Sequence, residues 1–478
     1  MIDLSTVQRV AKNTGVIIAG DVIFRLISLV VTIYLARYLG TVGLGKYSFV
    51  FAYLAFFNII TDLGIQQILV REMARDPAIA PKLIGNAYII RLILTVFAVV
   101  LSMVIITAMA YPADTTTYVY IAAFTLLFIS FSDFYRTIFE ANLRMEYNII
   151  AKLSFKVLSA ALILWIIFVL QGTLTQIMLA LVFSEMVKTV INYSFSKKFV
   201  RPRFVIDFGL WKYLFKECLP LAMTSVIWVI YYQIDTVMLS IMQGDVPVGL
   251  YSAAHKLCDP LLLIPSALMM SLFPIMSAYF KSSEDKLIKS YTLGFRYLLI
   301  VMLPIAIGIT LLSDKIILLI YGTEFAYSVT VLQILVWSIV FGSINSVLLS
   351  LLISIDKQKL NTLSTGICAI VNVTLNFFLI PTLSYNGAAI ATVATNVVLF
   401  AASFFFVSKH LQVLPVHKIA IKPIIGSLIM AAFVCYFVDI NMFLLISLAA
   451  VVYLAALLAL KTFTKEDWDI VRKIIKRR

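Results

Sequence analysis

The strongest constraint on this chain is an alternation between long apolar stretches and short loops of two kinds. Fourteen stretches are long enough to cross a bilayer as a helix, which takes roughly 20 apolar residues. Loops rich in Lys and Arg follow every second stretch. This pattern predicts an all-α integral membrane protein, because each helix satisfies its own backbone hydrogen bonds inside lipid. The expected spans are residues 13–38, 45–67, 83–110, 117–136, 149–170, 174–195, 213–242, 248–280, 287–312, 329–354, 360–380, 387–407, 419–438 and 443–463.

The basic residues predict how the chain is oriented. Of its 38 Lys and Arg residues, 31 fall on the side of the two termini, counting those at span edges, and 3 fall on the other side. Basic loops stay in the cytoplasm, so we expect a multi-pass protein of the cell membrane with both termini cytoplasmic. Topology and attraction to anionic lipid account for the net charge of +14 better than nucleic-acid binding does. The remaining four basic residues lie inside spans.

An internal repeat predicts the domain organisation. At an offset of 204 positions, six residues between Leu35 and Ser48 match residues between Leu239 and Ser252. The offset covers six spans, so the two copies insert in the same direction as a parallel repeat. We expect two six-helix lobes, residues 1–203 and 204–410, around a central cavity. Residues 411–478 would add two helices and a basic cytoplasmic tail. The matched glycines Gly40, Gly45, Gly244 and Gly249 are expected to be turn formers.

Signatures of enzymes and metal sites are missing from the sequence. It contains no GxxxxGK[ST], HExxH or GxSxG motif. The four cysteines are widely separated and none lies in a CxxC pair, so we expect neither a disulfide nor a bound metal. The loops are too short for the outer domain that a membrane-embedded glycosyltransferase or polymerase needs. We therefore expect a transporter with no catalytic residue and no cofactor.

Charged residues within the spans are candidate cargo or coupling sites, because each one costs roughly 2.5–3.5 kcal/mol at the bilayer centre. Asp21 and Arg25 are four positions apart and can pair on one helix face. At the repeat offset they correspond to Ser225 and Val229, and this asymmetry favours a role in cargo binding or coupling over a structural ion pair. Asp235 is a candidate for binding a coupling H⁺ or Na⁺.

Six further residues complete the candidate set. Arg91 and Lys256 either face the cavity or extend to an interface, and both readings stay open. Glu185 and Lys188, three positions apart, either pair structurally or contribute to coupling and cargo binding. His255, Lys256 and Asp259 lie within two turns of the span 248–280, where Pro260, Pro265 and Pro274 predict a kinked or broken helix. His255 is a cavity candidate and Asp259 a coupling candidate.

Four sequence segments resemble a known family. They are ARYLGTVGLG from Ala36, TDLGIQQILVREMAR from Thr61, YGTEFAYSVTVLQIL from Tyr321 and LNFFLIPTLSYNGAAIATV from Leu375. Together they resemble the polysaccharide transporter branch of the MOP exporter superfamily, which includes the Wzx-type flippases. The resemblance implies a V-shaped pair of lobes that moves a polyprenyl phosphate- or diphosphate-linked oligosaccharide to the outer leaflet. It also makes Arg25 the best match to the basic residues of the first helix in such flippases, with Asp21 as its partner.

The leading hypothesis is a flippase for an anionic lipid-linked oligosaccharide that works by alternating access. Membrane lipids and other glycan assembly proteins are the expected partners. The nearest alternative is an ion-coupled multidrug exporter of the same superfamily, although such exporters usually have twelve spans and acidic cavities. Intramembrane Arg and Lys suit an anionic cargo better, because they bind phosphate through charge-assisted hydrogen bonds.

Overall fold

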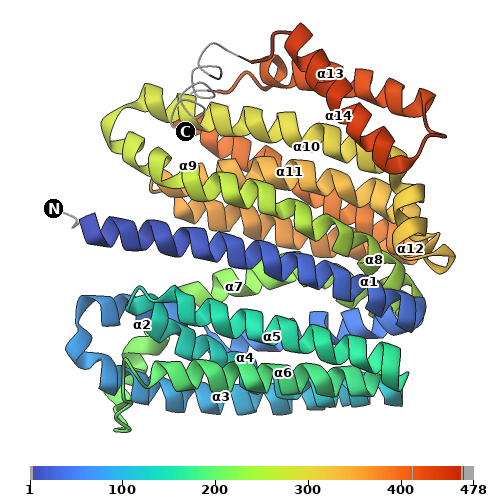
Figure 1. Cartoon of the computed structure of the whole chain (residues 1–478). Coiled ribbons are helices and arrows are strands. Elements are labelled where there is room, and N and C mark those ends of the chain that lie inside the picture. The colour runs from blue at the N-terminus through green and yellow to red at the C-terminus, as the bar shows by residue number, and fades with distance from the viewer. Residues whose placement is uncertain (1–3, 412, 464–466, 468–478) are drawn as a thin grey trace. The chain divides into compact units, whose positions relative to one another are not determined.

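The computed structural model describes residues 4–411, 413–463 and 467, with the backbone alone for residues 4–19 and 21. Within these residues the chain is a series of helices joined by short turns (Figure 1). The all-α membrane fold predicted from the sequence is therefore confirmed. The helices are α1 Leu4–Asp62, α2 Ile65–Arg75, α3 Ala80–Ala108, α4 Ala113–Ala141, α5 Met145–Trp165, α6 Leu174–Ser196, α7 Phe208–Gln243, α8 Asp245–Cys258, α9 Leu263–Ser282, α10 Glu284–Ile320, α11 Ser328–Ser354, α12 Gln358–His410, α13 Val416–Tyr436 and α14 Met442–Ala459.

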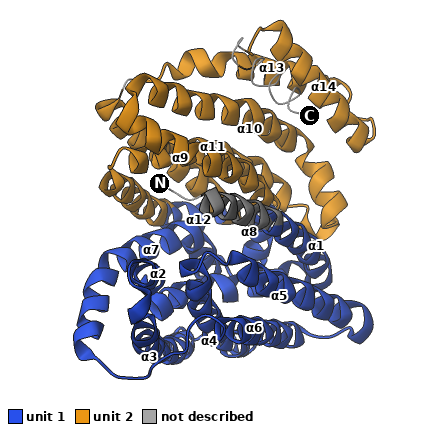
Figure 2. Cartoon of the chain, turned by 60° about the vertical axis from the view of Figure 1, so that its left-hand side comes forward, with its two compact units in different colours: residues 1–256, 376–384 blue, residues 257–375, 385–478 orange. Residues whose placement is uncertain are grey.

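Two compact units make up the chain (Figure 2). Unit 1 contains residues 1–256 and 376–384, and unit 2 contains residues 257–375 and 385–478. Helices α1 to α7 and most of α8 belong to unit 1, whereas α12 contributes to both units. These units follow spatial packing. The domains 1–203, 204–410 and 411–478 follow the sequence repeat and stay a prediction.

The described helices include long apolar stretches of the kind that cross a membrane. Twelve described helical stretches are long and apolar enough to cross a membrane. Two of them, Val22–Arg75 with 54 residues and Gln358–His410 with 53, would each measure about 80 Å as straight helices, far more than a bilayer core of about 30 Å. Each contains a kink, at Gly40 and at Ser384. Each is therefore long enough for two of the predicted spans, and the count of fourteen stays a prediction.

The repeat reappears in the backbone at Gly40 and Gly244. Gly40 has φ 64° and ψ −171°, and Gly244, 204 positions later, has φ 83° and ψ −164°. A side chain disfavours this left-handed region, so glycine lets the helix break in the same way in both copies. Gly45 and Gly249 have a different role from the turn formation expected of them, since both lie inside helices where a close backbone approach requires a glycine.

The predicted break in the span 248–280 is confirmed. Helix α8 ends at Cys258, a 3₁₀ turn covers Asp259–Leu262, and α9 starts at Leu263. Pro260 lies inside this turn, where its missing N–H and fixed φ interrupt the α-helical hydrogen bonds.

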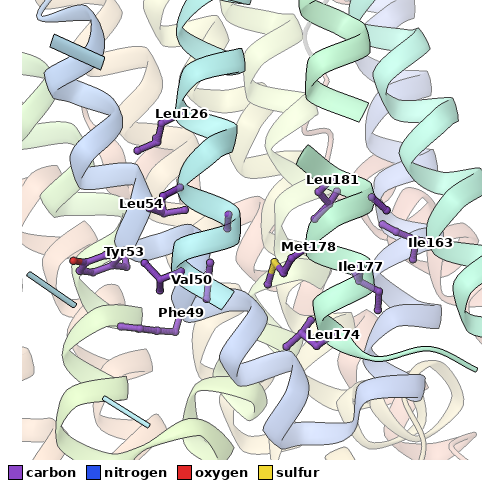
Figure 3. Packing of buried hydrophobic residues seen from close by; sticks show 14 of the residues in the cluster. Phe49, Val50, Tyr53, Leu54, Leu126, Ile163, Leu174, Ile177, Met178 and Leu181 are labelled. Atoms are coloured by element: carbon purple, nitrogen blue, oxygen red, sulfur yellow. The ribbon is translucent and has the colours of Figure 1, made fainter. Parts of the chain in front are cut away.

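A buried cluster in unit 1 fixes α1, α4, α5 and α6 against one another. Figure 3 shows part of it, with Phe49 and Tyr53 of α1, Leu126 of α4, Ile163 of α5 and further residues of α6. The hydroxyl of Tyr53 donates to the backbone oxygen of Ser102 at 2.7 Å, which ties α3 to the same cluster. Because this packing sets the register of α5 along α1, it decides which α5 side chains face α1.

The connector from Lys197 to Asp207, which joins α6 to α7, is held on α3. Fully buried Asn86 donates to the backbone oxygen of Val205 at 2.7 Å and accepts from the backbone N–H of Asp207 at 2.9 Å. The backbone N–H of Arg203 donates to the oxygen of Pro81 at 2.8 Å. The connector therefore has a defined conformation beside α3.

Candidate functional site

Two lysines of α5 and an aromatic ring of α1 form the centre of the candidate site. The ammonium groups of Lys152 and Lys156 lie 4.8 Å and 4.9 Å from the centre of the Phe24 ring. Lys156 also donates to the Ser28 hydroxyl at 3.0 Å. Lys152 and Lys156 are one helical turn apart, as are Phe24 and Ser28, so matching faces of the two helices meet.

Lys156 lies near the middle of its span. The apolar stretch runs from Met145 to Leu170, and Lys156 is 11 residues after its start, about 16 Å along the helix. Among the described side chains no carboxylate pairs with Lys156, and a second cation, Lys256 of α8, repels it. An ammonium group at this depth without an acidic partner is costly in a membrane, which makes Lys156 a candidate for binding an anion.

Arg25 follows Phe24 directly and is half-buried. The site draws cations from two helices of unit 1, namely Lys152 and Lys156 of α5 and Lys256 of α8. We call these three residues the cationic cluster. The side chain of Asp21, the expected partner of Arg25, lies outside the described residues.

Lys152 and Lys156 do not stand out in the charge pattern of the sequence, because both count with the basic loop after the span 117–136. Lys156 lies well inside α5, where a charge has no topological role. Their spacing of four positions within an apolar stretch indicates that both lysines lie on one face of a helix. The sequence does not indicate that this face packs along α1.

Arg91 lies away from the cationic cluster and joins helices within unit 1. It is 1% exposed, and its guanidinium lies 2.8 Å from a carboxylate oxygen of Asp62. Its Nε donates to the Ser130 hydroxyl at 3.0 Å. Asp62 also accepts from the backbone N–H groups of Gly64 and Gln66, both at 3.2 Å, where α1 ends and α2 begins. Arg91 thus fastens α3 and α4 to the end of α1.

Glu185 and Lys188 pair with each other within α6. Their charged groups lie 2.5 Å apart, and Glu185 is 7% exposed. The ammonium of Lys188 lies 5.1 Å from the centre of the Phe155 ring of α5. Through this contact the pair connects α6 to α5 at Phe155, the residue directly before Lys156.

Asp235 of α7 is buried among hydrogen-bond donors. One carboxylate oxygen accepts from the Tyr251 hydroxyl at 3.1 Å, and the other accepts from the Asn376 side-chain amide at 2.5 Å. Tyr251 in turn lies beside His255, with ring centres 5.9 Å apart. The structure therefore places two of the candidates, Asp235 and His255, in one polar region of unit 1 built from α7, α8 and the segment 376–384.

Asp259 lies elsewhere, in the 3₁₀ turn between α8 and α9 in unit 2. It is close enough to Tyr321 to act on it electrostatically. Burial raises the pKa of the Tyr321 phenol, and the negative charge of Asp259 raises it further.

Two family models match the chain. The model described as "Polysaccharide biosynthesis protein" matches residues 10–280, more than half of the chain, and the MatE model matches residues 220–378.

Curated relatives match over shorter segments. The probable low-salt glycan biosynthesis flippase Agl15 of Haloferax volcanii is 27% identical over 175 residues, 36% of this chain and 37% of the relative. An uncharacterized membrane protein of Methanocaldococcus jannaschii is 30% identical over 216 residues, 43% of this chain and 42% of that protein. The lipid II flippase MurJ of Bacillus subtilis is 27% identical over 181 residues, 36% of this chain and 33% of MurJ. The chain thus spans between a third and about two fifths of the length of these relatives.

Solved structures share the fold over most of the chain. A lipid II flippase MurJ in an inward closed conformation has a TM-score of 0.77 at 15% identity, covering 92% of this chain and 97% of MurJ. An inward-facing multidrug resistance MATE transporter of the MOP superfamily has a TM-score of 0.69 at 16% identity, covering 81% of this chain and 94% of the transporter. At this identity the likeness concerns the fold alone.

Proposed function

The chain belongs to the polysaccharide biosynthesis protein family, and from this premise we propose that it is a flippase for an anionic lipid-linked oligosaccharide. The match confirms the predicted resemblance to the polysaccharide branch of the MOP exporter superfamily. Two of the curated relatives are named as flippases, one in glycan biosynthesis and one for lipid II. These names support the proposal by analogy, since each match covers only part of either protein.

The observation that carries the proposal is the position of Lys156. An ammonium near mid-span, without a described carboxylate beside it, binds an anion more strongly than it would in water, because the local dielectric constant is low. A polyprenyl phosphate or diphosphate carries its negative charge at the junction between lipid and sugar. In the proposed mechanism the cationic cluster holds that junction while the hydrocarbon tail stays in lipid.

The direction of transport follows from the orientation predicted by the basic loops. With both termini in the cytoplasm of a cell membrane, the cargo is loaded from the cytoplasmic leaflet and released to the outer leaflet by alternating access. No chemical step on the cargo is part of this proposal.

Asp235 is the proposed coupling residue. A buried carboxylate that accepts from a hydroxyl and an amide can bind H⁺ or Na⁺ in their place and thereby link ion movement to a change in α7 and α8.

A multidrug exporter is the second candidate, and the MatE match to residues 220–378 favours it. Cationic drugs would be repelled by the cationic cluster. The two functions therefore differ in the sign of the cargo charge, which a transport assay measures directly.

The decisive experiment uses the purified chain in liposomes that contain a fluorescent polyprenyl diphosphate oligosaccharide. Loss of fluorescence after addition of an impermeant reductant reports exchange between leaflets. Wild-type protein should accelerate this loss, Lys156→Gln should abolish the acceleration, and Lys198→Gln, which alters a lysine outside the cluster, should not. If wild-type protein leaves the labelled lipid in place but expels cationic dyes, the exporter function replaces the proposed one.

A further inference from the structure

A second region of unit 1 combines an aromatic groove with basic residues at one end. The groove has a volume of about 790 Å³ and lies between α3, α4, α6 and the connector that follows α6. None of the three residues of the cationic cluster lines it. It is therefore a separate feature of the molecule, and neither the family matches nor the proposed transport cycle accounts for it.

Aromatic rings form the walls of the groove. The ring of Tyr88 lies 5.0 Å from that of Phe131 and 5.7 Å from that of Phe204. Tyr135 and Tyr193 lie 5.5 Å apart on the facing helices α4 and α6. Tyr193 and Phe204 are 44% and 61% exposed, so large apolar surfaces of the groove stay open. Surfaces of this kind take up hydrocarbon.

Lys197 and Arg201 line the same groove. Helix α6 ends at Ser196, so both residues lie just beyond the apolar span, where lipid headgroups begin. The ammonium of Lys197 lies 4.0 Å from the centre of the Tyr193 ring, which holds it at the mouth. Lys198 instead lies near the Phe195 and Tyr147 rings, at 5.4 Å and 6.0 Å, and is not part of the lining.

Hydrogen bonds and close packing hold the connector wall of the groove on α3. The backbone N–H of Arg203 donates to the backbone oxygen of Pro81 at 2.8 Å, and the side-chain amide of Asn86 donates to the backbone oxygen of Val205 at 2.7 Å. At Gly85, a Cβ atom would overlap the backbone oxygen of Arg203, so the connector lies directly on α3. A preformed groove binds a flexible chain with a smaller loss of entropy than a groove that must form on binding.

We propose that this groove binds an anionic phospholipid, with an acyl chain along the aromatic walls and the phosphate between Lys197 and Arg201. Charge complementarity selects this occupant. A zwitterionic lipid would fill the apolar part equally well but would gain less from the two cations. The site lies on a wall of α3, α4 and α6, and its occupancy does not depend on the cargo of the transporter.

The test measures lipid retained by the purified full chain in detergent, by native mass spectrometry, after addition of equal amounts of dioleoyl phosphatidylglycerol and dioleoyl phosphatidylcholine. Wild-type protein should retain phosphatidylglycerol preferentially. Each basic residue near an anionic headgroup contributes about fivefold, so the Lys197→Gln/Arg201→Gln double variant should weaken this binding by roughly thirtyfold. Lys198→Gln is the matched control and should bind as wild type does.

A second variant tests the apolar half of the site. Val190 lines the groove and is 54% exposed, so Val190→Trp places an indole where the acyl chain would lie. It should reduce binding of both lipids without a change in charge. The proposal is overturned if the double variant keeps the wild-type preference, or if Lys198→Gln loses as much. It is equally overturned if Val190→Trp displaces a co-purifying membrane protein while lipid binding is unchanged.

Discussion

Gly45 and Gly249, 204 positions apart, make reciprocal contacts: each lies against the backbone of the other's segment. A Cβ atom on Gly45 would overlap the backbone oxygen of Asp245, and one on Gly249 would overlap that of Thr41. Thr41 and Asp245 are themselves 204 positions apart. The two copies of the repeat therefore cross through equivalent atoms, within unit 1. Lys46, next to Gly45, adds an ion pair to Asp245 at 3.8 Å across the same crossing.

Gly249→Ala should force α1 and α8 apart at this crossing. Overpacking of this kind costs about 1–3 kcal/mol, so we expect a lower melting temperature in detergent and slower flipping in liposomes. Gly308→Ala is the control, because a Cβ atom there has open space around it. If Gly249→Ala has the same melting temperature and flipping rate as Gly308→Ala, close packing at this crossing contributes to neither stability nor transport.

Lys156→Met should separate stability from function. The variant replaces a mid-span cation by an apolar side chain of similar length, so the melting temperature should rise while flipping is lost. The rise is the informative result, because a purely structural lysine would lower the melting temperature when replaced. Thermal unfolding and the flipping assay on the same preparation provide both values.

Arg91→Lys tests a helix-joining contact. Lysine cannot bond Asp62 and Ser130 in the planar arrangement of the guanidinium, so one buried contact is lost. Since Asp62 is 29% exposed, we expect about 1–3 kcal/mol of destabilisation, less than for a fully buried pair. A double-mutant cycle with Asp62→Asn measures the coupling between the two side chains. Arg75→Lys, at a side chain 66% exposed, serves as the control. Loss of flipping at unchanged stability would instead assign Arg91 to the cargo.

Asp235→Asn removes the proposed coupling carboxylate but keeps its shape and its ability to accept from Tyr251. We expect flipping in liposomes to lose its dependence on an imposed H⁺ or Na⁺ gradient, while exchange at zero gradient persists. Asp439→Asn changes an exposed acid in the turn between α13 and α14 and should leave the gradient dependence intact. Normal gradient-driven transport by Asp235→Asn would remove Asp235 from the coupling mechanism.

The sequence by itself determined the all-α membrane fold and where several of its helices break. Span length and the spacing of basic loops are local properties. The breaks at Gly40, at Gly244 and around Pro260 also follow from backbone preferences of single residues. These features depend on the chain and the bilayer alone, so no knowledge of helix packing was needed.

Tertiary structure decided which charges within the spans meet. Arg91 is engaged by Asp62 and Ser130, whereas Lys152 and Lys156, which looked like loop residues, reach the Phe24 ring across the α1–α5 contact. The side-chain packing that sets the register of α5 along α1 joins residues more than 100 positions apart. A charge pattern read along the chain does not contain that register, because it arises only when the two helix surfaces pack together.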